Sequence, residues 1–542
     1  SATAHVKVAP VSEETGIALS DSPIIIPTSG QASVSALLAP SLRGSSVTWA
    51  LDVEGASIQP SADTLSATIT AGNRSARGTV TATVATPAGD KTATAPVEVH
   101  QSDYDDFVID ADGVLTQYRG SGSTINVPDT VTAIADEALR GVNAERINIP
   151  ATVRTIGNRV FADARRLTTV VFEDTADHPS QLTAIGAEAA ANTPALTEVA
   201  VPSKAASLGE GAFADSGITR LSLPDSLTSI PARLVKNSSL LTEAVVGNAV
   251  TEIGEAAFSA AHSLKGLSVR QADGSTAPGF PSSLVTIGQE AFNATGLGSV
   301  DLPASVRTIG DAAFNAIERL SHVGLNEGLV SIGSSAFRTT GITEIVIPDS
   351  VTTVGSSAFS ECSALTSAHI GRGVEAGQLS DAFTSSRQLS GFTVAPDNAS
   401  YEAVDGVLYS KDHTSLVVYP AGKGSGTTYT VLDETTRIES GAFNSAPLKG
   451  VVLPSSLRSI GDWAFSGSYL ESLVLPKAFE TFGECAFSGM PSLARVDLGG
   501  TKTIGEQAFL ASHALQEVDF RADLGRLTTI SAYAFAETGL VS

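Results

Sequence analysis

A pattern of apolar positions with a period of about 22 residues runs through most of the chain. Its clearest copy begins at Ile342, reads Ile-x-x-Ile-x-Ile-Pro-x-Ser-Val-x-x-Val-Gly-x-x-Ala-Phe and ends at Phe359. The closing phenylalanine later recurs every 22 residues, at Phe443, Phe465, Phe487 and Phe509. A period of about 20–29 residues with apolar positions on a strand is typical of a leucine-rich-repeat solenoid. The pattern therefore predicts an extended stack of coils rather than a compact domain.

Each repeat is predicted to contain two extended segments and one turn. The alternation at Val300-Asp301-Leu302 indicates a strand with its apolar side chains inward, and Pro303 follows where the strand must end. The Ser-Val-x-x-Ile-Gly phrase predicts a second extended stretch, and Ala-Phe is expected on a single helical turn that carries the ring into the core. Counting the phenylalanine position and its substitutes, Leu234 among them, gives about 16 repeats of 22–23 residues.

Residues 1–101 lack this period. Short alternating runs such as 47–51 and 79–84 are separated by Gly, Pro, Ser and Asn, which predicts a β-sandwich. The Val-Thr-Trp phrase at 47–49 and the later Gly-Thr-Val-Thr-Ala-Thr-Val phrase resemble bacterial immunoglobulin-like domains, and the resemblance implies a spacer module. No cysteine pair is present there, so we expect Trp49 to centre the core. The predicted domains are an immunoglobulin-like spacer at 1–101 and a solenoid at 102–542, joined near Gln101-Ser102-Asp103.

Two stretches, 271–280 and 393–437, interrupt the period. The second contains an Asp-Gly pair at 405–406 between alternating apolar residues, which predicts a hairpin over 401–409. Residues 416–420 supply a further strand. The final residues 538–542 match 295–299, where a new strand begins, so we expect native sequence to continue past Ser542. Ser1 in place of an initiator Met fits a processed or trimmed secreted chain.

The charge balance narrows the choice of partner. Asp and Glu number 57 against 33 Lys and Arg, which gives a formal net charge of −24. This balance argues against nucleic acid, which Lys and Arg must neutralise, and against an anionic membrane surface. No apolar run approaches the roughly 20 residues of a transmembrane helix, so no membrane insertion within this chain is expected. Cys362 and Cys485 lie about five coils apart, roughly 24 Å, which is too far for an intramolecular disulfide.

Two longer phrases carry a specific family resemblance. They are Ile-Pro-x-Ser-Val-x-x-Ile-Gly-x-x-Ala-Phe in the repeats, and the pair Asp-Gly-Val-Leu-Tyr-Ser-Lys-Asp and Val-Tyr-Pro-Ala-Gly-Lys at 405–412 and 418–423. Over about 105–542 the chain resembles the BspA-like leucine-rich repeats of the Treponema pallidum type. The resemblance implies a bacterial surface or secreted protein. Some members are implicated in adhesion to host matrix proteins, host cells or other bacteria.

Motifs for catalysis and metal binding are incomplete. The run 422–426 has one lysine among glycines but lacks the spacing of a phosphate-binding loop, so it predicts a flexible turn. The run 110–113 is close to a calcium loop, but Val108 stands where an Asp ligand belongs, so a hairpin turn is predicted. The histidines are scattered among different repeats, which disfavours a zinc site. We predict no enzymatic activity, no cofactor and no metal.

The outward positions of the predicted strands are the candidate binding residues. They are Glu198, Arg220, Asp301, Glu344, His369, Arg495, Asp497, Glu517 and Asp519. Arg495 should face Glu517, while Asp497 and Asp519 should stack about 4.8 Å apart. Like charges in that arrangement destabilise unless they are solvated or neutralised, so the alternatives are two solvated carboxylates or a weak site for a cation or basic partner. Val452 and Val474 are expected to form a small apolar patch, either ordinary surface or an interface.

A second row of residues precedes each Ala-Phe pair. It is polar in earlier repeats, which predicts exposure, but in the last repeats it holds Trp463, Cys485, Gln507 and Tyr533. Trp463 and Tyr533 are therefore candidates for contact with a partner or with a C-terminal segment, the alternative being packing against a neighbouring coil. Cys362 shares a different position with Ala261, Ile317 and Met490, and is predicted to be buried.

These observations predict a secreted or cell-surface adhesin or recognition protein. Its expected partner is an extracellular protein of the host matrix, a mucin or a bacterial surface, bound through the strand face. One alternative is a structural spacer or stalk that displays another module. A second is a glycan-binding accessory protein, which ranks lower because only Trp463 and Tyr533 stand out as aromatics beyond the core positions.

Overall fold

The computed structural model describes residues 11–20, 22–27, 30–72, 76–100, 106–520 and 526–541. Strands and turns make up nearly all of this part, and its one helical segment is a short 3₁₀ turn at Pro40–Leu42. None of the described residues belong to a helix that is long and apolar enough to cross a membrane. The chain divides into two compact units, Ser1–Leu196 and Thr197–Ser542.

The first unit opens with two four-stranded sheets. One has the order β1 (Ile17–Leu19), β3 (Gln31–Leu38), β6 (Ser66–Thr70), β5 (Ser57–Pro60), and the other β2 (Ile24–Pro27), β8 (Lys91–His100), β7 (Ala76–Val84), β4 (Thr48–Asp52). Their inward side chains share one apolar core, which contains Ile26, Val34, Ile69 and Val97. The sheets thus form a sandwich, and the immunoglobulin-like assignment of 1–101 stays a prediction. The expected linker at 101–103 lies outside the described residues.

Trp49 does not centre this core as expected. It lies half-buried on β4, at the end of its sheet, and its indole N–H donates to the carbonyl oxygen of Thr64 at 2.8 Å. The centre is filled by β-branched side chains instead, because the alternating strands of both sheets already direct them inward.

A hairpin begins the repeats of the first unit. Strands β9 (Phe107–Ile109) and β10 (Val114–Tyr118) pair antiparallel. The Asp110 carboxylate accepts the N–H groups of Asp112 at 3.0 Å and Val114 at 2.9 Å, which confirms the predicted hairpin turn. Two parallel ladders follow, formed by β11 (Thr124–Asn126), β13 (Arg146–Ile149) and β15 (Thr169–Phe172), and by β12 (Ala133–Ile134), β14 (Thr155–Ile156) and β16 (Ala184–Ile185).

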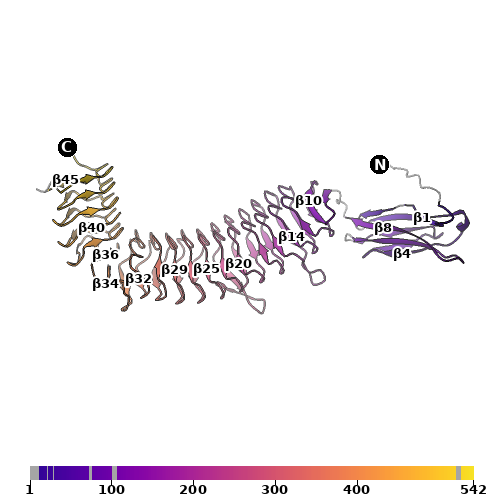
Figure 1. The fold of residues 1–542 in the computed structure, drawn as a ribbon, viewed down its shortest axis with the longest axis horizontal. Coiled ribbons are helices and arrows are strands. Elements are labelled where there is room, and N and C mark those ends of the chain that lie inside the picture. The colour runs from indigo at the N-terminus through magenta and orange to yellow at the C-terminus, as the bar shows by residue number, and fades with distance from the viewer. Residues whose placement is uncertain are drawn as a thin grey trace. The chain divides into compact units, whose positions relative to one another are not determined.

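The second unit repeats the same coil many times (Figure 1). The first strand of each coil presents one row of outward side chains, and these strands are β17 (Glu198–Ala200), β19 (Arg220–Ser222), β21 (Glu243–Val246), β23 (Leu267–Arg270), β26 (Ser299–Asp301), β28 (His322–Gly324), β30 (Glu344–Ile347), β32 (Ser367–Ile370), β33 (Gly391–Val394), β37 (Thr428–Thr430), β39 (Gly450–Val452), β41 (Ser472–Val474), β43 (Arg495–Asp497) and β45 (Glu517–Asp519). The second strands are β18 (Ser207–Leu208), β20 (Ser229–Ile230), β22 (Glu252–Ile253), β25 (Thr286–Ile287), β27 (Thr308–Ile309), β29 (Ser331–Ile332), β31 (Thr353–Val354), β38 (Arg437–Ile438), β40 (Ser459–Ile460), β42 (Thr481–Phe482), β44 (Thr503–Ile504) and β46 (Thr529–Ile530). The leucine-rich-repeat solenoid predicted from the period is confirmed.

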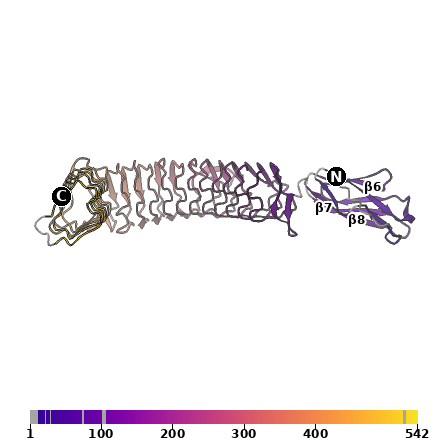
Figure 2. The same cartoon turned by 90° about the horizontal axis from the view of Figure 1, so that it is seen from above.

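The third side of each coil is a ladder of turns, not the single helical turn predicted. Glu290 and Ala294, which flank Phe292, have φ of 53° and 54°, in the left-handed region. The N–H groups of Glu290, Phe292 and Ala294 all donate to carbonyl oxygens of the next coil, at 2.8–2.9 Å. A helical turn would direct these N–H groups along its own axis, so it would leave the stacked coils unbonded at this side. Figure 2 shows the last coils end-on, with this closed outline.

The core is a column of stacked phenylalanine rings. Centroids of neighbouring rings from Phe258 to Phe359 lie 5.3–5.6 Å apart, with interplanar angles of 2–5°. One assignment from the sequence was wrong: Val235, not Leu234, occupies the ring position of its coil. The N–H of Phe213 donates to the Leu234 carbonyl and that of Val235 to the Ala257 carbonyl, which places Leu234 in the alanine position.

The insertion at 393–437 ends one column and begins another. Phe383 meets Phe392 edge-on at 5.1 Å, whereas Tyr419 stacks on Phe443 at 5.1 Å and starts the column that continues to Phe535. Strands β34 (Tyr401–Val404) and β35 (Val407–Ser410) form the predicted hairpin. Strand β36 (Ser415–Val418) then pairs parallel with β38 and so restarts the second ladder. At the other interruption, β24 (Thr276–Pro278) folds back antiparallel on β23.

Candidate functional site

The strand face, defined as the outward side chains of β17 to β45 in the second unit, holds nine of the predicted site residues. Alternation along each short strand directs one side chain into the core and its neighbours outward. Glu198, Arg220, Asp301, Glu344, Arg495 and Glu517 are exposed as predicted, and His369 and Asp519 are half-buried. The structure spreads these residues over many coils and does not gather them into one cluster. The strand face is therefore a long surface with several local groups.

Several polar side chains on the strand face have a complementary partner on the adjacent strand. Arg220 lies 3.1 Å from Glu243, and the His322 ring nitrogen lies 3.2 Å from the Asp301 carboxylate. His369 Nδ1 lies 2.9 Å from the Thr393 hydroxyl. These groups are at least partly in solvent, where such pairs stabilise by at most about 1 kcal/mol. They contribute little to the stability of the fold, and their main effect is on the pattern of charge at the surface.

The predicted register of the last two strands is confirmed. Arg495 pairs with Glu517 and Asp497 with Asp519 across β43 and β45. The Arg495 guanidinium lies 3.4 Å from the Glu517 carboxylate and 3.6 Å from that of Asp519. Asp519 therefore shares the positive charge of Arg495, on the adjacent strand, with Glu517.

Asp497 differs from both alternatives considered for it. Its side chain is only 3% exposed, so it is neither a solvated carboxylate nor an open cation site. The chain turns directly after β43, and the Asp497 carboxylate accepts the N–H of Gly499 at 3.0 Å. This carboxylate thus stabilises a turn. Across the described residues, no group of three or more His, Cys, Asp or Glu side chains is arranged to hold a metal ion.

The row of residues before Ala-Phe is exposed at its two aromatics. Trp463 and Tyr533 lie in the left-handed conformation with φ of 57° and 56°, and both rings face solvent. Cys485, expected to be exposed in the same row, is buried instead, and its sulfur lies 3.4 Å from the Gln507 side-chain oxygen. Burial raises the pKa of the Cys485 thiol, which lowers its reactivity. Cys362 is buried in the core position predicted for it.

Two valines form the predicted apolar patch on the strand face. Val452 on β39 is 51% exposed and Val474 on β41 is 59% exposed. The next strand, β43, pairs with β41 in register, so that Asp497 follows Val474 in the same outward row. The patch is thus bordered by the charged group of Arg495, Glu517 and Asp519.

Tyr469, in the coil of β41, is an exposed aromatic that the sequence did not single out. Its side chain is 50% exposed and borders a hollow of about 470 Å³, together with Arg387 and Lys449. Comparison of the repeats could have revealed it, because Tyr469 is a large aromatic at a position that Gly296 and Pro447 occupy in other coils. Arg387 carried no such signal, since it comes from a coil far away in sequence.

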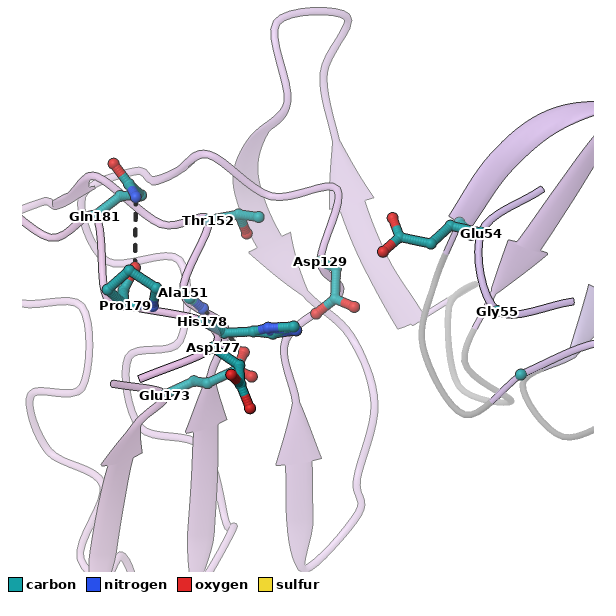
Figure 3. A pocket seen from close by; sticks show the side chains of 12 residues that line it. Glu54, Gly55, Asp129, Ala151, Thr152, Glu173, Asp177, His178, Pro179 and Gln181 are labelled. Atoms are coloured by element: carbon teal, nitrogen blue, oxygen red, sulfur yellow. Dashed lines mark hydrogen bonds between the residues drawn. The ribbon is translucent and has the colours of Figure 1, made fainter. Parts of the chain in front are cut away.

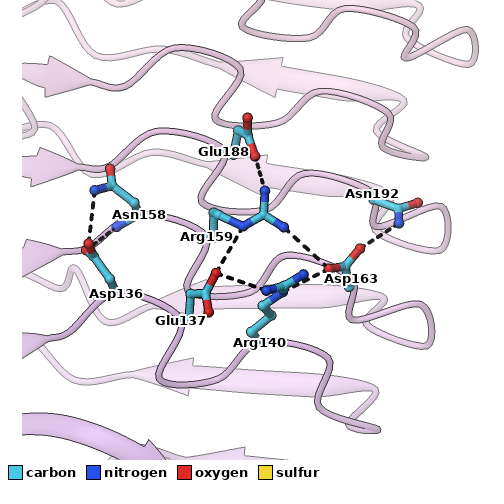
Figure 4. Close-up of polar contacts among 8 residues, drawn as sticks. All are labelled: Asp136, Glu137, Arg140, Asn158, Arg159, Asp163, Glu188 and Asn192. Atoms are coloured by element: carbon cyan, nitrogen blue, oxygen red, sulfur yellow. Dashed lines mark hydrogen bonds and ion pairs between the residues drawn. The ribbon is translucent and has the colours of Figure 1, made fainter.

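The turn side of the first unit carries a separate network of charges (Figure 4). Arg140 lies 3.0 Å from both Glu137 and Asp163, and Arg159 lies 3.2 Å from Glu137. Hydrogen bonds from Asn192 and Arg140 hold the pKa of Asp163 below its usual value. These side chains are partly exposed and pair with one another across neighbouring coils, so the network orders the turn ladder.

A short acidic loop also leaves the first unit's coils after β15 (Figure 3). The N–H of Thr175 donates to the His178 carbonyl at 3.1 Å, and the N–H of His178 donates to the Thr175 hydroxyl at 3.0 Å. The Glu173 carboxylate accepts the N–H of Ala151 at 3.2 Å. These bonds explain the loop as a closed turn anchored to the preceding coil.

The fold and its outward rows define a leucine-rich-repeat solenoid. The family described as "BspA type Leucine rich repeat region" matches residues 118–215, 175–273, 280–402 and 428–542. These matches span well over half of the chain, so the protein belongs to the BspA-type leucine-rich-repeat family. No curated protein matches it.

Several solved structures of bacterial proteins are similar to this chain. A leucine-rich repeat protein from Bacteroides ovatus is 21% identical, with a TM-score of 0.45, covering 81% of this chain and 100% of its own. A leucine rich cell surface protein from Faecalibacterium prausnitzii is 22% identical, with a TM-score of 0.33, covering 78% and 94%. The T. pallidum leucine-rich repeat protein is 15% identical, with a TM-score of 0.27, covering 48% and 86%. These likenesses concern the repeat architecture alone.

Proposed function

We propose that this protein is an extracellular or cell-surface recognition protein that binds a macromolecule through the strand face of its C-terminal coils. Adhesion to a host matrix protein, a mucin or a bacterial surface is the role that fits this site. Membership of the BspA-type family supports the proposal. The excess of acidic residues supports it as well, because a net charge of −24 disfavours binding to nucleic acid and to anionic membranes.

The observation that carries the proposal is the exposed pair Val452 and Val474 on neighbouring coils. Aliphatic side chains in this solenoid otherwise serve mainly the core, and two on the same outward row create apolar surface that water does not favour. The charges of Arg495, Glu517 and Asp519 lie on the next strands. An apolar centre with a charged rim is the usual anatomy of a protein interface.

The first experiment is a binding screen with the whole chain. The protein is applied to an array of matrix proteins, mucins and glycans, with and without calcium. A saturable hit identifies the class of partner, whereas silence across the array favours a structural spacer role.

Variants at the valine pair then locate the site. The double variant Val452→Asp and Val474→Asp places two carboxylates in the apolar centre, and we expect it to weaken binding at least about tenfold, because a desolvated unpaired charge costs more than 1.4 kcal/mol. Val346→Asp is the matched control, since Val346 is 56% exposed in the same outward row of an earlier coil. Equal binding by all variants, or equal loss in the control, would contradict this site.

A further inference from the structure

A hollow of about 470 Å³ opens in the second unit where the loop after β36 meets the coils of β39 and β41. Its walls include Arg387, Ser425, Lys449, Tyr469 and Glu471. The volume lies within the range of sites for small ligands, about 300–1,000 Å³. Nothing in the repeat consensus requires this hollow, because it arises at the insertion that interrupts the stack.

Hydrogen bonds hold the walls of the hollow in place. The N–H of Gly422 donates to the Leu389 carbonyl at 2.7 Å, and the N–H of Gly426 donates to the Pro447 carbonyl at 2.8 Å. The loop that contains Ser425 is thereby fixed on one side to the coil of Arg387 and on the other to the coil of Lys449. A ligand would meet a preformed site and would not bear the entropic cost of ordering it.

The charge in the hollow is opposite to that of the chain as a whole. Arg387 is exposed, and among the residues that the structure describes it makes no ion pair and no hydrogen bond. Lys449 lies 3.9 Å from Glu471, at the outer limit of an ion pair. Two cations thus face one carboxylate in a protein of net charge −24. This balance favours a ligand with a single negative group.

The remaining walls suit a sugar ring. The half-exposed ring of Tyr469 offers an apolar face, and amphipathic tyrosines commonly supply such faces in binding sites. Ser425, Ser445 and Ser492 also line the hollow, and serine hydroxyls can donate and accept hydrogen bonds, although that of Ser445 already donates to the Asn444 side chain. We propose that the hollow binds an acidic monosaccharide unit, with its carboxylate on the forked guanidinium of Arg387 and its ring against Tyr469.

The test uses the whole chain and paired probes in saturation-transfer NMR. The acidic probes are 3′-sialyllactose and glucuronic acid, and their neutral counterparts are lactose and glucose. We expect transfer to the ring protons of at least one acidic sugar, and none to its neutral counterpart. Equal transfer to the neutral sugars, or no transfer to either acidic probe, would overturn the proposal.

Matched variants assign the contacts. Arg387→Gln and Tyr469→Ala should each weaken binding of the acidic sugar at least about fivefold, a loss of about 1 kcal/mol. Arg319→Gln, at an exposed arginine in a similar loop of an earlier coil, should leave it unchanged. Unaltered binding by the Arg387 and Tyr469 variants would place the sugar elsewhere. Because these variants do not touch Val452 or Val474, failure here is distinguishable from failure of the proposed macromolecular site.

Discussion

Non-glycine residues in the left-handed conformation recur along this solenoid. Within the described coils they flank the core ring at pairs such as Ala312 and Ala316, with φ of 52° and 57°. This conformation brings the Cβ atom close to the following carbonyl oxygen and costs about 1–2 kcal/mol per residue. The N–H of Ala312 donates to Ser334 and that of Ala316 to Arg338, at 2.8 and 2.9 Å, so bonds between coils offset the strain. The repeat tolerates many side chains at these positions because the backbone N–H, not the side chain, bonds to the next coil.

This strain predicts opposite effects of one substitution at two alanines. Ala312→Gly should raise the stability by about 0.5–1 kcal/mol, because glycine adopts φ of 52° without the Cβ penalty. Ala304→Gly, at an exposed turn outside the left-handed residues, should lower it by about 0.4–1 kcal/mol through the entropy of the unfolded chain. The midpoint of urea unfolding, compared with the parent protein, measures both. Destabilisation by both variants would contradict the strain argument.

At the scale of the element, the insertion at 393–437 acts as a new starting cap for the stack. Tyr419 takes the ring position, and its hydroxyl donates to the Lys423 carbonyl at 3.0 Å. Tyr409 and Tyr429 share a hydrogen bond of 2.7 Å beside it. Burial raises the pKa of Tyr419 to about 12 and also raises that of Tyr429. A buried phenol cluster replaces the preceding coil that the Phe443 ring would otherwise meet.

The tyrosine cluster predicts an alkaline weakness. The neutral form of Tyr419 is favoured in the folded state, where its pKa is about 12 against 10 in the unfolded chain. Its contribution to stability is therefore complete below pH 10 and is lost as the pH rises toward 12. Unfolding midpoints measured over this range should fall in the parent protein and fall less in Tyr419→Phe, which keeps the ring. That variant should cost about 1 kcal/mol near neutral pH for the lost hydrogen bond. An equal alkaline fall in both proteins would exclude this cause.

At the scale of the second unit, stability should be local. Each coil packs mainly against its neighbours, as in other solenoids, and the ring columns ending at Phe383 and starting at Tyr419 are separate. Damage in one column is then transmitted poorly to the other. The insertion is the natural boundary between two cooperative blocks.

This boundary predicts that a core variant on one side of the insertion destabilises the coils on that side and not those on the other. Phe337→Ala should lower the opening free energy of the coils around it by about 3–5 kcal/mol, because it empties a fully buried ring position. Phe465→Ala should do the same for the coils after the insertion. Amide hydrogen exchange resolved along the chain measures both, and each variant serves as the control for the other. Uniform loss of protection by either variant would show a single cooperative unit.

Much of this architecture was predictable from the sequence because it is periodic and local. The repeat of about 22 residues set the coil, alternation set which side chains point inward, and the Asp-Gly pair at 405–406 set a hairpin. The register of Arg495 against Glu517 followed from counting along equal repeats. The core position of Cys362 followed in the same way. Each of these features depends on residues within one coil or on its translation to the next.

Other features were decided only by the tertiary structure. Hydrogen bonds between coils hold the Ala-Phe segment as a turn with residues in the left-handed conformation, where a helical turn was expected. A turn after β43 buried Asp497, and a neighbouring coil covered Cys485. The hollow unites Arg387 with Tyr469 across the insertion. The sequence by itself determined the repeating coil, because translation along the stack preserves it. A local turn and a contact with the next coil decided the burial of Asp497 and Cys485. Contacts between non-equivalent coils formed the hollow, because no period in the sequence encodes where such segments meet.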